Sequence, residues 1–156
     1  MKKAIPLHES IEHFNGPFSF LSNFYPAEVH LDGLEYPTVE HAFQAAKSVS
    51  LQHRERVQSA STPGKAKRLG RGVKLRHDWE DVKVAIMGDL LRSKFTYHED
   101  LGVKLLATGD AHLVEGNDWG DTFWGVCNGV GENWLGQLLM QVRRELQEDK
   151  LELKGG

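Results

Sequence analysis

The sequence is poor in the residues that cross-link a chain or bind structural metals. Cys127 is its single cysteine, which excludes an internal disulfide and any cysteine-based zinc site. The eight histidines are scattered and form no H-E-x-x-H arrangement, so no metal is indicated. A G-x-S-x-G motif is absent, and no basic residue stands next to Cys127. The sequence therefore indicates neither a serine triad nor a nucleophilic cysteine.

Long apolar segments are also missing. No stretch approaches the roughly 18 consecutive apolar residues of a membrane-spanning helix, and the N-terminal residues lack the apolar core of a signal peptide. We therefore expect a cytoplasmic protein. A net charge of −3 argues against broad, nonspecific binding to nucleic acid. With 156 residues, 40% of them hydrophobic, the chain is expected to form a single domain over 1–156.

Local patterns predict short strands followed by helices. Aromatic residues alternate with small residues between Phe14 and Tyr25, which predicts strands and turns there. Asp32-Gly33 predicts a β-hairpin between two short apolar segments. Helical patterns begin after Thr38, which is placed to serve as an N-cap. Further helices are expected over 52–60, 63–69, 78–95, 99–107 and 133–147, with Gly70 ending the second of these and the residues after Asp149 frayed.

The helix after Thr38 carries a polar stripe. At about 100° per residue, Glu40, Gln44 and Lys47 fall on one face, so a carboxylate, an amide and an ammonium converge. Small residues beside them suit close packing, which favours a stripe that faces into the protein. The alternative is an ordinary solvated helix face. If the stripe is buried, these groups need partners or a ligand.

A basic stretch follows at 64–77. It contains no acidic residue before Asp78, and its charged members are Lys65, Lys67, Arg68, Arg71, Lys74 and Arg76. Such a run is often simply solvated. Arg71, however, lies between Gly70 and Gly72, which let a ligand approach the backbone closely. An arginine in that position could clamp a phosphate through two hydrogen bonds.

A glycine-rich segment at 116–131 interleaves acids with aromatic rings. Asp118, Trp119, Asp121 and Trp124 would supply two carboxylates and two flat rings that can stack on a heterocyclic base. The alternative is a structural Asx turn with buried indoles. The G-V-G sequence at 129–131 could offer backbone N–H groups to a phosphate, although a lone G-x-G is weak evidence.

These features together fit a ligand with a flat base, a ribose and a phosphate. Cleavage of a ribosyl carbon–nitrogen bond builds positive charge on the sugar. A nearby carboxylate stabilises that charge or deprotonates the attacking water. The residues alone therefore indicate chemistry at the sugar carbon, with a binding module that recognises the same nucleotide as the alternative.

Several ordered motifs between Phe14 and Leu146 resemble the NADAR (NAD and ADP-ribose associated) or YbiA-like family. The matching segments are F-L-S-N-F (20–24), Y-P-T-V-E-H-A-F-Q-A-A-K (36–47), G-R (70–71), W-E-D-V-K (79–83), D-T-F-W-G (121–125) and G-V-G-E-N-W-L-G-Q-L-L-M (129–140). The resemblance covers nearly the whole chain and sets the core at about 14–147. It implies an α+β fold that is mainly α-helical, a YbiA-like single domain with a small antiparallel β ribbon.

The resemblance implies an N-glycosidase that needs no metal and no cofactor. Some members of the family hydrolyse ribosylamino-pyrimidine phosphates of early riboflavin synthesis, and others remove ADP-ribose from guanine bases. The expected partner is therefore a small ribosyl phosphate or ADP-ribosyl compound, or a modified nucleic acid, and no membrane. A noncatalytic module that binds NAD or ADP-ribose is the alternative from another class.

Position by position, the resemblance assigns Glu40 as the principal catalytic carboxylate, with Asp121 and Trp124 on the opposite side of the pocket. Asn23 and Arg71 resemble ligand-positioning residues, and Lys47 either holds phosphate or forms a Schiff base with the opened sugar. Further substrate-binding candidates are Gln44, Trp79 and Trp119. Glu132 departs from the basic residue expected in many relatives, and an acid beside Gly131 weakens a phosphate site there.

Overall fold

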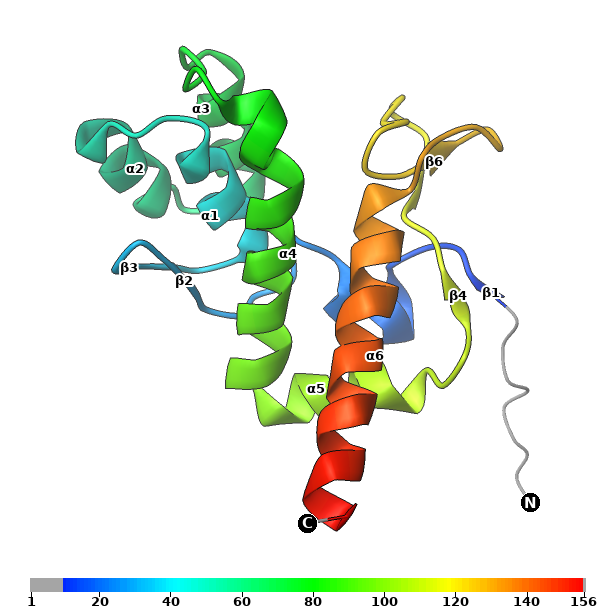
Figure 1. Cartoon of the computed structure of the whole chain (residues 1–156). Coiled ribbons are helices and arrows are strands. Elements are labelled where there is room, and N and C mark those ends of the chain that lie inside the picture. Colours follow the sequence, from blue (N-terminus) through cyan, green and yellow to red (C-terminus); the bar gives the residue numbers. More distant parts are fainter. Residues whose placement is uncertain (1–9, 156) are drawn as a thin grey trace. The chain divides into compact units, whose positions relative to one another are not determined.

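The computed structural model describes residues 10–155 and divides them into two compact units. The first unit comprises residues 10–22 and 98–155, and the second comprises residues 23–97. Figure 1 traces both along the chain. Helices make up 55% of the chain beside two-stranded sheets, which confirms the mainly helical α+β class. The single domain stays a prediction.

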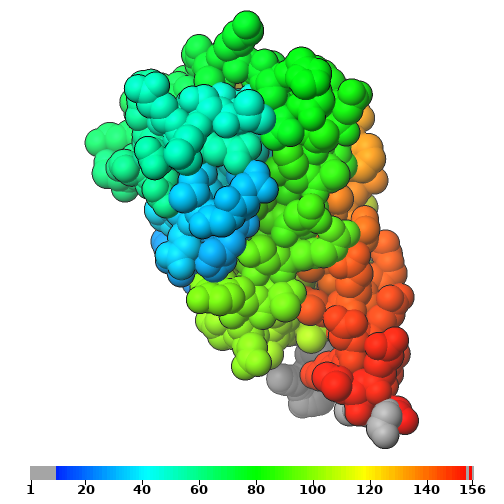
Figure 2. Space-filling view, turned by 60° about the vertical axis from the view of Figure 1, so that its left-hand side comes forward, coloured from blue at the N-terminus to red at the C-terminus, as the bar shows by residue number. Residues whose placement is uncertain are grey.

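The second unit joins a β-hairpin to a group of helices. Its elements are β2 (Val29–Leu31), β3 (Leu34–Tyr36), α1 (Val39–Ala46), α2 (Leu51–Gln58), α3 (Pro63–Arg71) and α4 (Trp79–Tyr97). Figure 2 shows one face of this unit, with the blue hairpin below the cyan residues of α1 and α2 and beside the green α4. Helix α1 packs against α2, α3 and α4, so its side chains are enclosed from several directions.

The predicted hairpin is confirmed. Strands β2 and β3 pair antiparallel, with Val29 opposite Tyr36. Asp32 and Gly33 both have positive φ angles, 50° and 86°. Two such residues form the tight turn whose twist matches that of the flanking strands.

Helix α1 begins where the sequence predicts. The Thr38 hydroxyl accepts a hydrogen bond of 3.0 Å from the backbone N–H of His41, which caps the helix. Every residue from Val39 to Ala46 is buried. The prediction that the polar stripe faces inward is therefore correct for Glu40 and Gln44, whereas Lys47 at the end of the helix is half-buried.

Helix α3 differs from the prediction at its end. The sequence predicts termination at Gly70, but the helix continues to Arg71 and Gly72 follows as the C-cap. Gly70 is buried, and a Cβ placed there would overlap Oε1 of Gln44 on α1. The glycine is thus explained by the close approach of two helices and not by helix termination.

The first unit is built around a long C-terminal helix. Its elements are β1 (Ser10–Ile11), the 3₁₀ helix η1 (Gly16–Leu21), α5 (Glu99–Ala107), β4 (His112–Leu113), β5 (Gly116–Asn117), β6 (Val126–Cys127) and α6 (Trp134–Gly155). Strands β1 and β4 pair in parallel, as do β5 and β6. The apolar stripe of α6 is buried as its spacing predicts, with Leu135, Leu138, Leu139 and Val142 in the core.

Two expectations for the first unit are wrong. The aromatic segment near the N-terminus forms η1 and not only strands and turns, because Pro17 at the start of that turn favours helical φ angles. The residues after Asp149 continue α6 to Gly155 and do not fray. Their sequence contains good helix formers, such as Glu152, and no proline or glycine before Gly155.

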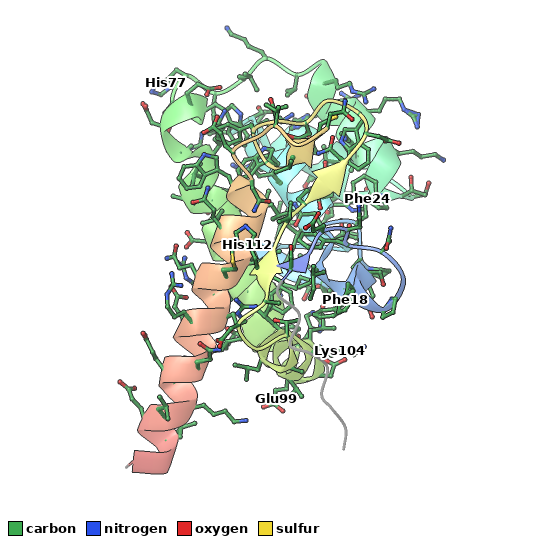
Figure 3. All side chains as sticks on the ribbon, turned by 90° about the vertical axis from the view of Figure 1, so that its right-hand side faces the viewer. Phe18, Phe24, His77, Glu99, Lys104 and His112 are labelled. Atoms are coloured by element: carbon green, nitrogen blue, oxygen red, sulfur yellow. The ribbon has the colours of Figure 1, made fainter. Side chains whose placement is uncertain are left out.

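Aromatic rings of η1 pack against α5. Phe20 is buried, and Nζ of Lys104 lies 5.7 Å from the centroid of its ring. Figure 3 labels Phe18 and Lys104, which lie close together and line a cavity of about 270 Å³.

Along residues 10–155, every helix is too short or too polar to cross a bilayer.

The core of the second unit contains a buried lysine. Lys94 on α4 has an exposed fraction of 0%, and its Nζ lies 5.5 Å from the ring centroid of Tyr25 and 5.0 Å from that of Phe95. Ring faces attract a cation, but they do not replace the water that burial removes. Burial therefore lowers the pKa of Lys94 to about 7.

This lysine makes the stability of the protein depend on pH. The pKa of Lys94 is about 7 in the folded protein, against about 10.4 for an exposed lysine in the unfolded chain. Between these values the unfolded chain binds more protons, so the free energy of unfolding rises with pH. We expect Lys94→Met to flatten this rise, measured by urea unfolding from pH 7 to pH 10. Exposed Lys65→Met should keep the wild-type slope, and equal slopes for all three proteins would contradict the prediction.

Candidate functional site

A buried carboxylate is the central feature of the second unit. Glu40, in the first turn of α1, is 7% exposed, and one turn later Gln44 is 4% exposed. Nε2 of Gln44 donates a hydrogen bond of 2.7 Å to Oε2 of Glu40. The i and i+4 spacing makes this pair possible, and the packing around α1 removes it from water. A carboxylate in this position can react only with a ligand that enters the site.

Several charged groups act electrostatically on Lys47, at the end of the same helix. Burial lowers the pKa of Lys47, Glu40 raises it, and Lys67, Arg71 and Lys83 each lower it further. These groups come from the end of α1, from α3 and from α4, and both α3 and α4 pack against α1. Lys83 already has a carboxylate partner, since its Nζ lies 2.7 Å from Oε1 of Glu80. Lys47, Lys67 and Arg71 add further positive charge, which favours an anion.

Arg76, within the basic stretch, is committed to a structural ion pair. Its guanidinium binds Asp78 through contacts of 2.6 Å and 3.2 Å, and its backbone N–H donates to the Lys47 carbonyl at 2.7 Å. Arg76 thus fixes the end of α1, whereas Arg71 is exposed at the end of α3. Arg76 is therefore a structural residue, whereas Arg71 remains the arginine that is predicted to bind phosphate.

Asn23 lies at the start of α1. Its backbone carbonyl accepts a hydrogen bond of 3.1 Å from the N–H of Glu40, and its Nδ2 lies 3.6 Å from Sδ of Met87. Oδ1 of Asn23 is buried and has no hydrogen-bond partner within the described residues. A buried acceptor without a donor is costly, so this oxygen suits a hydroxyl or amine of a ligand.

Trp79 is placed in the packing of the helices. It is 5% exposed and lies against Phe43, with 5.0 Å between the ring centroids. Packing alone explains a large ring at the start of α4, and its part in substrate binding stays a prediction. Together, the second unit collects Asn23, Glu40, Gln44, Lys47 and Arg71 at α1 and its neighbours.

The remaining predicted residues belong to a loop of the first unit. Oδ1 of Asn117 accepts hydrogen bonds from the backbone N–H groups of Trp119 and Asp121, at 3.2 Å and 3.0 Å. Oδ1 of Asp121 in turn accepts from the N–H groups of Phe123 and Trp124, at 3.2 Å and 2.9 Å. The structural alternative for this loop, an Asx turn, is thus present at Asp121. Catalytic and binding roles for Asp121, Trp119 and Trp124 stay predictions.

Glycines beyond this loop serve its shape. Asn128 and Gly129 have φ angles of 54° and 79° and turn the chain between Cys127 and Val130, whose backbones pair. A Cβ at Gly131 would overlap the carbonyl of Gly125. The G-V-G segment is therefore explained by a tight turn and a close backbone approach.

The first unit also contains a cavity of about 650 Å³ beside this loop. Trp119, which is 61% exposed, forms part of its lining with Glu12, Glu115 and Asp118. Acceptors next to a flat ring suit a heterocycle that is rich in N–H donors. Within the part of the chain that the structure describes, no group of three or more His, Cys, Asp or Glu side chains could hold a metal ion.

Sequence reasoning missed the part that three residues play in this region. Lys67 and Lys83 act on Lys47 electrostatically, and Gly70 packs against Gln44. The helical spacing of Lys67 and Arg71, four residues apart, is a usable signal for a shared face. Lys83 lies on a different helix, so only the packing of α4 against α1 reveals it.

Comparison with known proteins places the chain in a family. A model of the NADAR domain matches residues 11–147. The chain belongs to the NADAR family. Among its relatives, "N-glycosidase YbiA" of Shigella flexneri is 44% identical over 132 residues, which cover 83% of this chain and 82% of that protein.

Two further relatives extend the comparison. "Riboflavin biosynthesis protein VVA0006" of Vibrio vulnificus is 42% identical over 151 residues, which cover 95% of this chain and 40% of that longer protein. The NMR structure of the E. coli protein YbiA matches with a TM-score of 0.80 and 36% identity, over 95% of this chain and 96% of that one. Both the predicted family and its fold are confirmed.

These relatives also confirm the class of enzyme, an N-glycosidase. The alternative of a noncatalytic binding module gains no support from them. The substrate, the cytoplasmic location and the individual site residues remain predictions at this point.

The charges around Lys47 give a direct test of the site's electrostatics. Lys67→Gln removes one cation that lowers the pKa of Lys47, so we expect that pKa to rise. NMR titration of the lysine side chains would measure it. Lys65→Gln is the matched control, because Lys65 lies two residues away on α3 and its ammonium is bonded to Ser61. A Lys47 pKa unchanged by Lys67→Gln would disprove the proximity inferred here.

Proposed function

We propose that this NADAR protein hydrolyses the base–ribose N-glycosidic bond of a phosphorylated ribosyl compound. One observation carries the proposal: the buried carboxylate of Glu40 and a group of cations both act electrostatically on Lys47. A carboxylate suits the positive charge that develops on the sugar. The cations suit the phosphate of the same substrate.

Glu40 would act at the sugar carbon. As the bond from C1 of the ribose to the base nitrogen breaks, positive charge spreads over C1 and the ring oxygen, and an ionised carboxylate nearby stabilises it. The same carboxylate can accept a proton from the water that attacks C1. The hydrogen bond from Gln44 fixes the orientation of the carboxylate for both tasks.

The cations would hold the phosphate. Lys67 and Arg71 share a face of α3, and Lys47 and Lys83 come from the end of α1 and from α4. An arginine binds a phosphate through a fork of two N–H groups, and lysines add point charges. Burial is the main cause of the lowered pKa of Lys47, and the three cations lower it further. Binding of an anion would offset the part that the cations contribute. This is the physical reason to expect a substrate with at least one phosphate.

Other predicted residues would recognise the ribose and the base. The unpartnered Oδ1 of Asn23 suits a ribose hydroxyl as its donor. Trp124 would stack on a heterocyclic base, and Asp121 stays a catalytic candidate, as the motif at 121–125 implies. Trp119 lies outside that motif and would add a second ring for stacking. The Asx turn of Asp121 supports a role in holding Trp124, because one carboxylate oxygen accepts from the Trp124 N–H.

The name of the Vibrio relative supports a ribosylamino-pyrimidine phosphate as substrate. Removal of ADP-ribose from guanine is the second candidate. It is favoured by the basic stretch with Lys65, Arg68, Arg71 and Lys74, whose charges suit a longer polyanion. A steep loss of activity with added salt would distinguish a nucleic-acid substrate from a small one.

The role of Glu40 is tested with Glu40→Gln. We expect kcat/KM to fall by about 10²- to 10⁴-fold, the usual loss for a general acid or base. Wild type and variant would be incubated with a ribosylamino-pyrimidine phosphate and, separately, with DNA bearing ADP-ribosylated guanine, and products read by mass spectrometry. Wild-type-only release of ribose 5-phosphate supports the first substrate, and release of ADP-ribose supports the second.

Glu35→Gln is the matched control, since Glu35 is exposed on β3 and pairs with His30. It should keep wild-type turnover. Folding of both variants would be compared by circular dichroism. A folded Glu40→Gln protein with wild-type turnover would show that Glu40 is not the catalytic carboxylate.

The role of Lys47 separates two mechanisms. In the hydrolytic mechanism Lys47 binds phosphate, so Lys47→Arg should keep most of the activity. Reduction of the wild-type protein with cyanoborohydride during turnover should then trap no adduct. In the alternative, its amine attacks the aldehyde of the opened sugar and forms a Schiff base with loss of water, which reduction fixes. A sugar adduct mapped to Lys47 by peptide mass spectrometry would replace the hydrolytic mechanism.

A further inference from the structure

Gly70 marks the point where the backbone of α3 passes the side chain of Gln44. A Cβ at this position would lie 2.8 Å from Cδ and 3.1 Å from Cβ of Gln44 and would overlap Oε1. Only glycine leaves room for the amide in its observed place. We propose that Gly70 is a positioning residue for the N-glycosidase reaction. It acts through the Gln44 amide, which orients the Glu40 carboxylate. This inference rests on the role proposed for Glu40.

The Gln44 side chain is confined from two sides. Its Nε2 donates to Oε2 of Glu40 at 2.7 Å, while its Oε1 is buried against Gly70 without a hydrogen-bond partner among the described residues. Its backbone carbonyl lies 3.1 Å from Nε2 of His53 on α2, which anchors this turn of α1. The amide therefore has one position in which its N–H reaches the carboxylate.

A side chain at position 70 would disturb this arrangement in two ways. Rotation of the amide could clear Oε1, but it would break the hydrogen bond to Glu40. Gln44 Cβ is fixed to the backbone of α1, so relief of the 3.1 Å contact needs α1 and α3 to move apart by a few tenths of an ångström. Because α3 carries Lys67 and Arg71, binding of the phosphate would weaken as well.

The loss of the hydrogen bond has a signature that simple destabilisation lacks. A donor to a carboxylate favours its ionised form. Without the Gln44 donor, ionised Glu40 is less favoured, so the acidic limb of the profile of kcat/KM against pH moves to higher pH. A protein that is merely less stable loses active molecules without moving this limb.

The test is a double-mutant cycle of Gly70→Ala and Gln44→Ala, with kcat/KM measured on the substrate that wild type cleaves. Each single variant should lose about ten- to a hundredfold, in line with one hydrogen bond to a charged group. Alanine at position 44 vacates most of the space that a Cβ at position 70 needs. The double variant should therefore lose much less than the product of the two single losses, because only the contact with Cβ at position 44 remains.

Another glycine of α3 serves as the control. At Gly64 the nearest atom to an added Cβ would be Thr62 Oγ1 at 3.9 Å, which is an ordinary contact. Gly64→Ala should keep wild-type kcat/KM and its pH profile. If Gly70→Ala does not fold, Gln44→Leu, which removes the donor and leaves Gly70 in place, still tests the shift of the acidic limb.

The outcomes separate this inference from the proposed function. Additive losses in the cycle, or a folded Gly70→Ala protein with wild-type kcat/KM, would overturn the positioning role while leaving Glu40 as the catalytic carboxylate. A Gln44→Leu profile that matches wild type would overturn it as well. If Glu40→Gln is itself fully active, the proposed function fails first, whatever the cycle gives.

Discussion

The hydrogen bond between Gln44 and Glu40 holds a carboxylate inside the second unit, away from water. Burial of an ionised group without partners costs several kcal/mol, so the surrounding elements must supply donors and cations. Glu40 lies in the first turn of α1, where the helix dipole favours a carboxylate. The packing of α3 and α4 on α1 then decides which side chains reach this carboxylate.

The same packing lowers the pKa of Lys47. Burial has the largest effect, Glu40 raises the pKa, and Lys67, Arg71 and Lys83 lower it further. In the proposed function, an anionic ligand would offset the repulsion from these cations. Buried Lys94 is a separate case, because aromatic rings lie against its ammonium and its low pKa follows from burial.

The first unit organises its loop by a different means. Amide and carboxylate oxygens of Asn117 and Asp121 accept backbone N–H groups, and glycines allow the turns between them. These turns give the backbone N–H groups hydrogen-bond partners and leave the Trp119 ring exposed at the cavity. Trp119 itself lies in no helix or strand. Asp121 therefore shapes the loop through its side chain as well as carrying a carboxylate suited to a ligand.

Local signals predicted much of this protein. The Asp32-Gly33 turn, the Thr38 cap and the apolar stripe of α6 depend on neighbours in sequence, so the residues alone indicate them. The polar stripe of Glu40 and Gln44 follows from helical spacing, and the family from its ordered motifs. Errors arise where local signals are ambiguous. A glycine at position 70 is typical of a helix end, and a polar C-terminal segment is typical of fraying, yet neither occurs here.

The sequence by itself thus determined the family, the class of enzyme and the carboxylate on which the proposed chemistry depends. Only the tertiary structure decided that Gly70 abuts Gln44, that Lys83 acts on Lys47 from another helix, and that Trp79 lies in the packing against Phe43. The physical reason is that helical spacing orders side chains along one element, whereas distances between elements depend on how closely their backbones can approach.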